Sequence, residues 1–234
     1  MRLAACIGND FRLQYRNGFY LAYVFVTVFY ALFLRALPQD IRQLFLPVFI
    51  FNDPALAGLF FVGGMVLLEK GDGVFSALSV TPVSTRVYLL SKVLTLTALS
   101  VASSLAVAAA AGGLALNWPL LVLGVTLSAV PFILLGILIV SRFRGLATNM
   151  VVAGLVIAPL LAPFLEYFGV LKSRAFWLSP VKPAMMLISG GLRLAELCAS
   201  ETMLAAACLV GWSAGLGVWA WKWFKRYVVG RVSA

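Results

Sequence analysis

The chain has 234 residues, of which 63% are apolar and 11% are charged, and its formal net charge is +10. A soluble domain of this length needs a largely polar surface, so the composition excludes one and indicates a chain solvated by lipid. At about 20 residues per span, the length allows roughly five to seven spans and no separate soluble domain. The basic residues then mark the cytosolic ends of spans, and we expect no binding to nucleic acid.

Several chemistries are excluded by what the chain lacks. It has no histidine, and its three cysteines form no CxxC pair, so we predict neither a zinc site nor a disulfide framework. It has no GxxxxGK[ST] phosphate loop and no GxSxG elbow. The adjacent Ser91 and Lys92 would point in different directions from one helix, which disfavours a catalytic dyad. We therefore expect no catalytic, metal-binding or cofactor-binding residue on this chain.

Residues 2–16 predict an amphipathic helix in the lipid headgroup layer. At about 100° per residue, the apolar face collects Leu3, Ala4, Ile7, Phe11 and Tyr15, and the opposite face collects Arg2, Asn9, Arg12 and Arg16. Arginines toward anionic lipid and apolar side chains toward the acyl chains are typical of an interfacial helix.

The apolar runs that follow predict an all-α polytopic membrane protein with six transmembrane helices. These spans cover about residues 18–34, 54–69, 86–111, 120–140, 148–165 and 202–224. Residues 166–201 hold prolines and a Gly-Gly pair, which predict an outer loop with short helical pieces.

The start of the second span is set by Asn52-Asp53-Pro54. Asp53 is suited to cap a helix and Pro54 to occupy its first position. We therefore predict that Asp53 is an N-cap near the outer interface. The apolar Leu44–Phe51 would then be a separate outer segment, either interfacial or re-entrant.

The charges give the orientation of these spans. One side carries 12 of the 18 basic residues and three of the eight acids, and the other side carries the rest. Lys and Arg accumulate on cytosolic segments. We therefore predict a multi-pass protein of the cell membrane with both termini in the cytosol.

Two of the predicted spans carry small residues at every fourth position, which lets helix backbones approach closely in lipid. They are Ala98, Ala102, Ala106 and Ala110 in the third span and Ala207, Gly211 and Gly215 in the sixth. The spacing predicts helix packing and leaves open whether the contact lies within or between subunits.

The interval 69–92 is the most informative part of the sequence. Asp72 is placed to cap a short amphipathic helix that carries Phe75 and Leu78, and Thr81-Pro82 ends it. A short apolar helix between two spans, on the basic side, is suited to docking a soluble partner.

This interval resembles the cytosolic loop of ABC-2-type exporter permeases. The residues in the corresponding places are Glu69, Gly73, Leu78, Thr81, Pro82, Tyr88 and Lys92. The six-span layout, the N-terminal interfacial helix and the broken outer segment are similar too, so the resemblance covers nearly the whole chain. The stretches LLEKGD and SVTP look most like those of small fluoroquinolone export permeases.

The resemblance implies two permease subunits, identical or different, around a central pathway for an amphipathic compound, for example a drug such as a fluoroquinolone. Each subunit would couple through its loop to a cytosolic ATP-binding subunit, which holds the ATP. Val74, Phe75 and Leu78 would fill a groove on that subunit, next to Gly73 and the Thr81-Pro82 break. Glu69 and the N-terminal helix would help to anchor the contact, although Glu69 also fits an ordinary interfacial acid.

Three alternatives stay open. A haem-exporter-type permease of cytochrome c maturation has similar length and span count, and the lack of histidine argues against it. A membrane-embedded hydrolase or transferase would need convergent polar groups in the spans, where Ser and Thr more often bond their own helix. An assembly subunit that recruits an ATPase for signalling would stimulate hydrolysis without moving a substrate.

Overall fold

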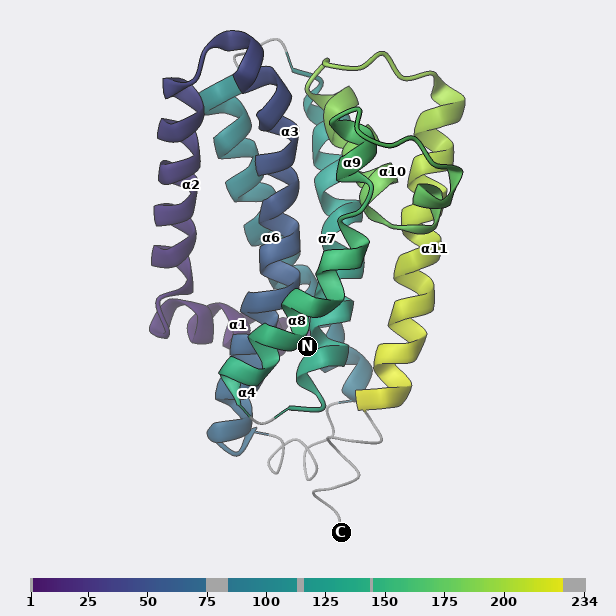
Figure 1. Cartoon of the computed structure of the whole chain (residues 1–234). Helices are drawn as coiled ribbons and strands as arrows, with labels where there is room; N and C mark the ends of the chain where they lie inside the picture. Colours follow the sequence, from purple (N-terminus) through teal and green to yellow (C-terminus); the bar gives the residue numbers. More distant parts are fainter. Residues whose placement is uncertain (1, 75–83, 113–115, 144, 225–234) are drawn as a thin grey trace.

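The computed structural model describes residues 2–74, 84–112, 116–143 and 145–224, and every regular element in these ranges is helical, as predicted (Figure 1). The elements are α1 (Arg2–Arg16), α2 (Phe19–Ala36), α3 (Gln39–Leu56), the π-helical segment η1 (Ala57–Phe61), α4 (Val62–Gly71), α6 (Thr85–Gly112), α7 (Trp118–Val140), α8 (Leu146–Leu160), α9 (Phe164–Tyr167), the 3-10 segment η2 (Arg174–Leu178), α10 (Val181–Gly191) and α11 (Ala199–Phe224).

Within the described ranges, five helical stretches are long and apolar enough to cross a membrane, which confirms an all-α polytopic membrane protein. They cover Phe19–Ala36, Gln39–Gly71, Thr85–Ala111, Trp118–Val140 and Ala199–Trp223. The predicted span 148–165 corresponds to α8, which is apolar but has 15 residues. At 1.5 Å per residue α8 is about 22 Å long, short of a hydrocarbon core of about 30 Å.

The prediction that a second span begins at Pro54 is wrong. The helix runs without a break from Gln39 through η1 to Gly71, so Leu44–Phe51 is part of it and not a separate segment. Proline inside a helix leaves the carbonyl four residues earlier without its N–H donor. Here Ser104 Oγ, on α6, donates to that carbonyl of Ile50 at 3.4 Å. A neighbouring helix thus satisfies the freed group, as lipid requires.

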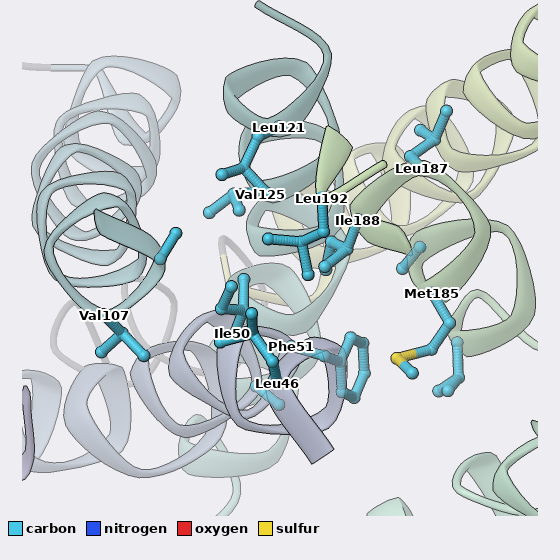
Figure 2. Close-up of a cluster of buried hydrophobic side chains, with 14 of the residues drawn as sticks. Leu46, Ile50, Phe51, Val107, Leu121, Val125, Met185, Leu187, Ile188 and Leu192 are labelled. Atoms are coloured by element: carbon cyan, nitrogen blue, oxygen red, sulfur yellow. The ribbon is translucent and has the colours of Figure 1, made fainter. Parts of the chain in front are cut away.

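The centre of the molecule is α7, which is apolar on all sides. It packs extensively against all the other long helices except α2. Figure 2 shows Leu121 and Val125 of α7 beside Ile50 of α3 and Ile188 of α10. A helix that is apolar all round is a buried one. The short α10 was predicted only as a piece of the outer loop 166–201, yet nearly all of it is buried against α3, α7 and α11.

Glycines on α7 and its neighbours allow the closest backbone approaches. A methyl group on Gly136 would overlap the carbonyl oxygen of Gly58 in η1, and one on Gly58 would overlap the α7 backbone at Phe132. A methyl group on Gly191 of α10 would lie 2.7 Å from the backbone nitrogen of Leu121. Glycine at these three positions therefore permits η1 and α10 to lie against α7.

Helix α1 lies across one end of the bundle, nearly at right angles to α2 (Figure 1). This end, called the α1 end below, also holds the end of α4 and the beginning of α6. The predicted helix 2–16 is therefore present. Phe11 and Tyr15 are exposed on it, whereas Asp10 and Gln14 are buried against the bundle.

Candidate functional site: a buried ion cluster at the root of the 69–92 interval

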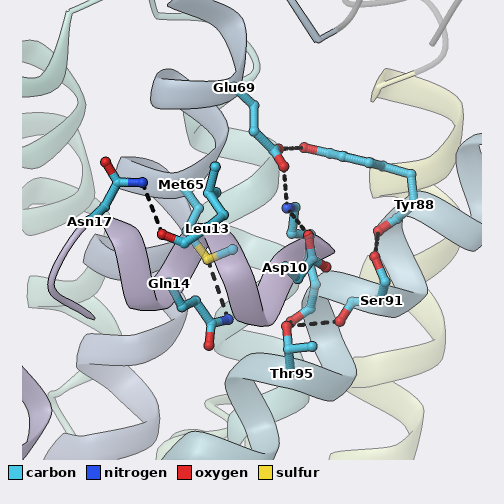
Figure 3. Close-up of polar contacts among 10 residues, drawn as sticks. Asp10, Leu13, Gln14, Asn17, Met65, Glu69, Tyr88, Ser91 and Thr95 are labelled. Carbon is cyan, nitrogen blue, oxygen red and sulfur yellow. Dashed lines mark hydrogen bonds and ion pairs between the residues drawn. The ribbon is translucent and has the colours of Figure 1, made fainter. Parts of the chain in front are cut away.

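A buried lysine joins three helices at the α1 end. Lys92 of α6 is fully buried, and its Nζ donates to Asp10 Oδ1 of α1 and, at 2.5 Å, to Glu69 Oε1 of α4 (Figure 3). Tyr88 Oη donates to the other oxygen, Glu69 Oε2, at 2.5 Å. We call Asp10, Glu69, Tyr88 and Lys92 the ion cluster.

The local sequence explains how the ion cluster assembles. Tyr88 and Lys92 are four residues apart on α6 and so share one face, with Lys92 Nζ 5.1 Å from the centre of the Tyr88 ring. Glu69 lies in the last turns of α4, where that helix meets α6. Removing one partner of a buried ion pair leaves an uncompensated charge, which costs about 3–5 kcal/mol. The cluster therefore fixes the positions of α1, α4 and α6 relative to one another.

Neighbouring polar side chains make local hydrogen bonds. Ser91 Oγ donates to the Tyr88 carbonyl at 2.9 Å, and Thr95 Oγ1 donates to the Ser91 carbonyl at 2.9 Å. Ser91 and Lys92 thus point to different partners, in line with the expectation that they form no dyad. On α1, Gln14 Nε2 donates to Met65 Sδ at 3.6 Å.

The first residues of the 69–92 interval contact two more parts of the chain. Arg16 of α1 forms an exposed ion pair with Asp72 at 3.4 Å. Lys70 Nζ donates to the carbonyl of Phe143, in the turn after α7, at 3.3 Å. Gly73 has φ of +69°, a left-handed conformation that favours glycine after a helix end. The root of the interval is therefore held by α1, α6 and the α7–α8 turn.

Of the residues predicted to contact an ATP-binding subunit, the structure describes Glu69, Gly73 and Val74. Glu69 is 1% exposed and its two carboxylate oxygens face Lys92 and Tyr88, so it is neither an ordinary interfacial acid nor a surface contact. Val74 is half-buried. Phe75, Leu78, Thr81 and Pro82 lie outside the described residues.

Cys6 lies four residues before Asp10 on the same face of α1. Burial raises the pKa of the Cys6 thiol, and the Asp10 carboxylate raises it further, with a smaller opposing effect from Lys92. The pKa of the Cys6 thiol therefore offers a way to test the charge of Asp10.

A second polar cluster lies midway along the long helix Gln39–Gly71. Asp53 is buried, and its Oδ2 accepts from Ser103 Oγ at 2.9 Å. Ser104 Oγ lies 3.4 Å from both Asp53 Oδ2 and the Ile50 carbonyl oxygen, and shares its one hydrogen between them. Ser103 Oγ lies 2.6 Å from Thr27 Oγ1 of α2. The prediction that Asp53 is an N-cap is wrong, because the helix continues past it and its carboxylate bonds to α6. We call Thr27, Asp53, Ser103 and Ser104 the hydroxyl cluster.

The two stripes of small residues do not pack inside the subunit. Ala98, Ala102 and Ala106 are exposed and Ala110 is half-buried, because α6 turns its serine face inward. Ala207, Gly211 and Gly215 are exposed on α11, and a methyl group on Gly211 or Gly215 would meet no atom within 4 Å. The close approaches use Gly58, Gly136 and Gly191 instead.

The long apolar helices define a multi-pass membrane protein. The chain belongs to the Fluoroquinolones export permease protein family, which matches residues 1–232. It is 29% identical over 231 residues to the fluoroquinolones export permease proteins of two Mycobacterium tuberculosis strains, CDC 1551 / Oshkosh and ATCC 25618 / H37Rv. Each alignment covers 98% of this chain and 98% of the relative. The resemblance inferred from LLEKGD and SVTP is thereby confirmed.

Sequence reasoning missed the ion cluster, although Tyr88 and Lys92 were among the residues that carried the resemblance. One pattern in the sequence could have indicated it. Lys92 lies well inside an apolar helix, where a charge needs a partner of opposite sign. Glu69 and Asp10, both next to apolar runs on the same predicted side, were the available partners.

Proposed function

We propose that this chain is the permease subunit of an ATP-driven ABC exporter of amphipathic compounds, fluoroquinolones included. The observation that carries the proposal is the match over the whole chain to permeases named for fluoroquinolone export. The chain carries no phosphate loop of its own, so a separate ATP-binding subunit supplies the energy. In this proposal both termini lie in the cytosol, on the side where the basic residues gather.

The ion cluster supports a specific way of coupling. The two helices that border the 69–92 interval, α4 and α6, are joined to each other by Lys92 and Glu69 and to α1 by Asp10. A force on the interval therefore moves these three helices together. Glu69 acts as a positioning residue for the interval, and Phe75 and Leu78 make the contact with the ATP-binding subunit.

The exposed stripes support a second permease subunit. Ala102 on α6 and Gly211 on α11 offer flat surfaces at which helices of another subunit approach closely. Whether that subunit is a second copy or a different permease is decided by the composition of the purified complex.

The test is transport by the reconstituted complex. The chain is co-expressed with a candidate ABC ATP-binding protein, purified and placed in proteoliposomes. We expect ATP-dependent accumulation of a fluorescent fluoroquinolone. Hydrolysis stimulated without accumulation would instead indicate an assembly or signalling subunit.

The docking residues are tested in the same complex. Replacing Phe75 and Leu78 by Glu should abolish co-purification of the ATP-binding protein and leave membrane insertion intact. The control is Val170→Glu, which adds a charge at the strongly exposed Val170, in the segment 166–201 that has no proposed part in docking. Normal co-purification of the Phe75/Leu78 variant would contradict the docking assignment.

A further inference from the structure

Two apolar grooves flank α11 at the α1 end. The first, of about 380 Å³, lies between α6, α7 and α11, and its apolar lining includes Leu90, Val130 and Val218. The second, of about 370 Å³, lies between α7, α8 and α11, and its apolar lining includes Ile139 and Val156. Both are apolar along most of their length.

Each groove has an arginine stacked on a tryptophan at its mouth. The guanidinium of Arg86 lies 4.1 Å from the ring centre of Trp221, and that of Arg142 lies 4.8 Å from the ring centre of Trp223. Stacking occupies the face of the guanidinium and leaves the N–H donors along its edge free to bind an oxyanion. Tryptophan at this level is typical of the membrane interface.

Within the part of the chain that the structure describes, these two arginines have no anionic partner. All eight acids of the chain lie in the described ranges, and none of them forms an ion pair with Arg86 or Arg142. By contrast, Lys92, Lys182 and Arg16 are each paired with a carboxylate. Both arginines are exposed. The grooves thus combine unpaired positive charge at the mouth with an apolar interior.

We propose that each groove binds an acyl chain of an anionic phospholipid, whose phosphate is held by the edge of Arg86 or Arg142. Basic pockets between transmembrane helices on the cytosolic side are suited to anionic headgroups. The depth of the first groove favours lipid over an acidic segment of a soluble partner. Val130 lies about 15 Å along α7 from Val140 at 1.5 Å per residue, a depth that an acyl chain reaches and a soluble protein does not.

The proposal concerns lipid and not the exported compound, and it does not depend on the ATP-binding partner. Its test is native mass spectrometry of the purified full-length chain with dioleoyl phosphatidylglycerol or dioleoyl phosphatidylcholine. The two lipids have the same acyl chains and differ in headgroup charge. We expect tighter binding of phosphatidylglycerol, with each of Arg86→Gln and Arg142→Gln weakening it by about five-fold.

Two further variants distinguish the effect of the arginine charge on lipid binding from the effect of the apolar groove. Arg174→Gln removes an exposed arginine on η2 that lines neither groove, and it should leave phosphatidylglycerol binding unchanged. Gly217→Leu fills the first groove and keeps the charge, since a methyl group there lies 3.8 Å from Leu134 Cδ1, an ordinary contact. It should weaken phosphatidylglycerol binding as Arg86→Gln does.

Three outcomes would overturn the proposal. Equal binding of the two lipids would exclude headgroup recognition, and an equal loss in Arg174→Gln would mean diffuse attraction to positive charge. Unchanged lipid binding in Arg86→Gln and Arg142→Gln, together with loss of ATP-binding-protein association, would assign the arginines to a protein contact. Thermal unfolding of each variant verifies that it is folded.

Discussion

The ion cluster and the hydroxyl cluster are two buried polar sites on the same long helix, built in different ways. Glu69, near one end of Gln39–Gly71, meets a buried cation, whereas Asp53, midway along, accepts hydrogen bonds from the hydroxyls of Ser103 and Ser104. Both contact α6. The difference indicates that charged contacts hold the helices firmly where the 69–92 interval begins and ends. Weaker hydrogen bonds between neutral and charged groups hold them in the middle of the bundle.

The π-helical segment η1 lies between the two clusters, where Gly58 meets Gly136 of α7. π-helical turns inside α-helices often occur at functional sites. The long helix is thus held by charge at one end, by hydroxyls midway and by backbone contact with α7 between them. Each of these contacts is open to separate replacement.

The largest effect is expected for Lys92→Met. It leaves Asp10 and Glu69 buried without a cation, so we expect a loss of about 3–5 kcal/mol, measured as thermal unfolding in detergent. Lys182→Met is the matched control. It breaks the partly exposed pair with Glu166, and we expect a loss of no more than about 1 kcal/mol.

A triple variant sharpens this test. Asp10→Asn, Glu69→Gln and Lys92→Met together remove all three charges and should recover much of the stability, because no charge is left buried and unpaired. Should Lys92→Met be as mild as Lys182→Met, the ion cluster would not be the main fixation at the α1 end.

A feature of this fold can be predicted from the sequence when the contacts that determine it join residues close together in the chain. Apolar runs predict helices close to α2, α6, α7 and α11, since a helix in lipid satisfies its own backbone. Asp53-Pro54 led to a wrong prediction of a helix start, because the same two residues also fit inside a helix. What decides between them is the Ser104 hydroxyl on another helix, which bonds the Ile50 carbonyl.

The same reason limits what the sequence says about packing. Periodicity selected Ala102 and Gly211, which are exposed, and gave no indication of Gly58 or Gly136, which lie in contact. Small residues permit close approach in either case, and the sequence does not say which face meets a neighbour. The ion cluster likewise joins residues far apart in the chain, and only the unusual lysine within an apolar helix pointed to it.

A smaller loss is expected for Gly136→Ala. The added methyl group overlaps the Gly58 carbonyl oxygen, so η1 and α7 must separate, and overpacking of this kind costs typically about 1–3 kcal/mol. Gly211→Ala is the control, because its methyl group meets nothing within 4 Å and alanine favours the helix. Equal unfolding temperatures for the two variants would contradict the close contact between η1 and α7.

Asp53→Asn tests the hydroxyl cluster and should have a smaller effect again. The amide oxygen still accepts from Ser103, and hydrogen bonds between helices in membranes are worth about 0.6 kcal/mol on average, with a maximum near about 1.7. We therefore expect a loss below about 2 kcal/mol, less than that of Glu69→Gln, which takes one of two carboxylates from Lys92. A larger loss for Asp53→Asn would reverse the ranking of the two clusters.

The finest test measures the charge of the ion cluster through Cys6. Burial and the Asp10 carboxylate both raise the pKa of the Cys6 thiol, so less thiolate is present at a given pH and alkylation is slow. In a Cys198→Ser/Cys208→Ser background, Cys6 is the one remaining cysteine of the chain. Asp10→Asn should then move the alkylation profile of Cys6 to lower pH, because the nearby negative charge is gone. Asp72→Asn removes an exposed acid at the same end and should leave the profile in place. An unchanged profile in Asp10→Asn would mean that the Asp10 carboxylate does not act on Cys6, and that the charge of the cluster is confined to Lys92 and Glu69.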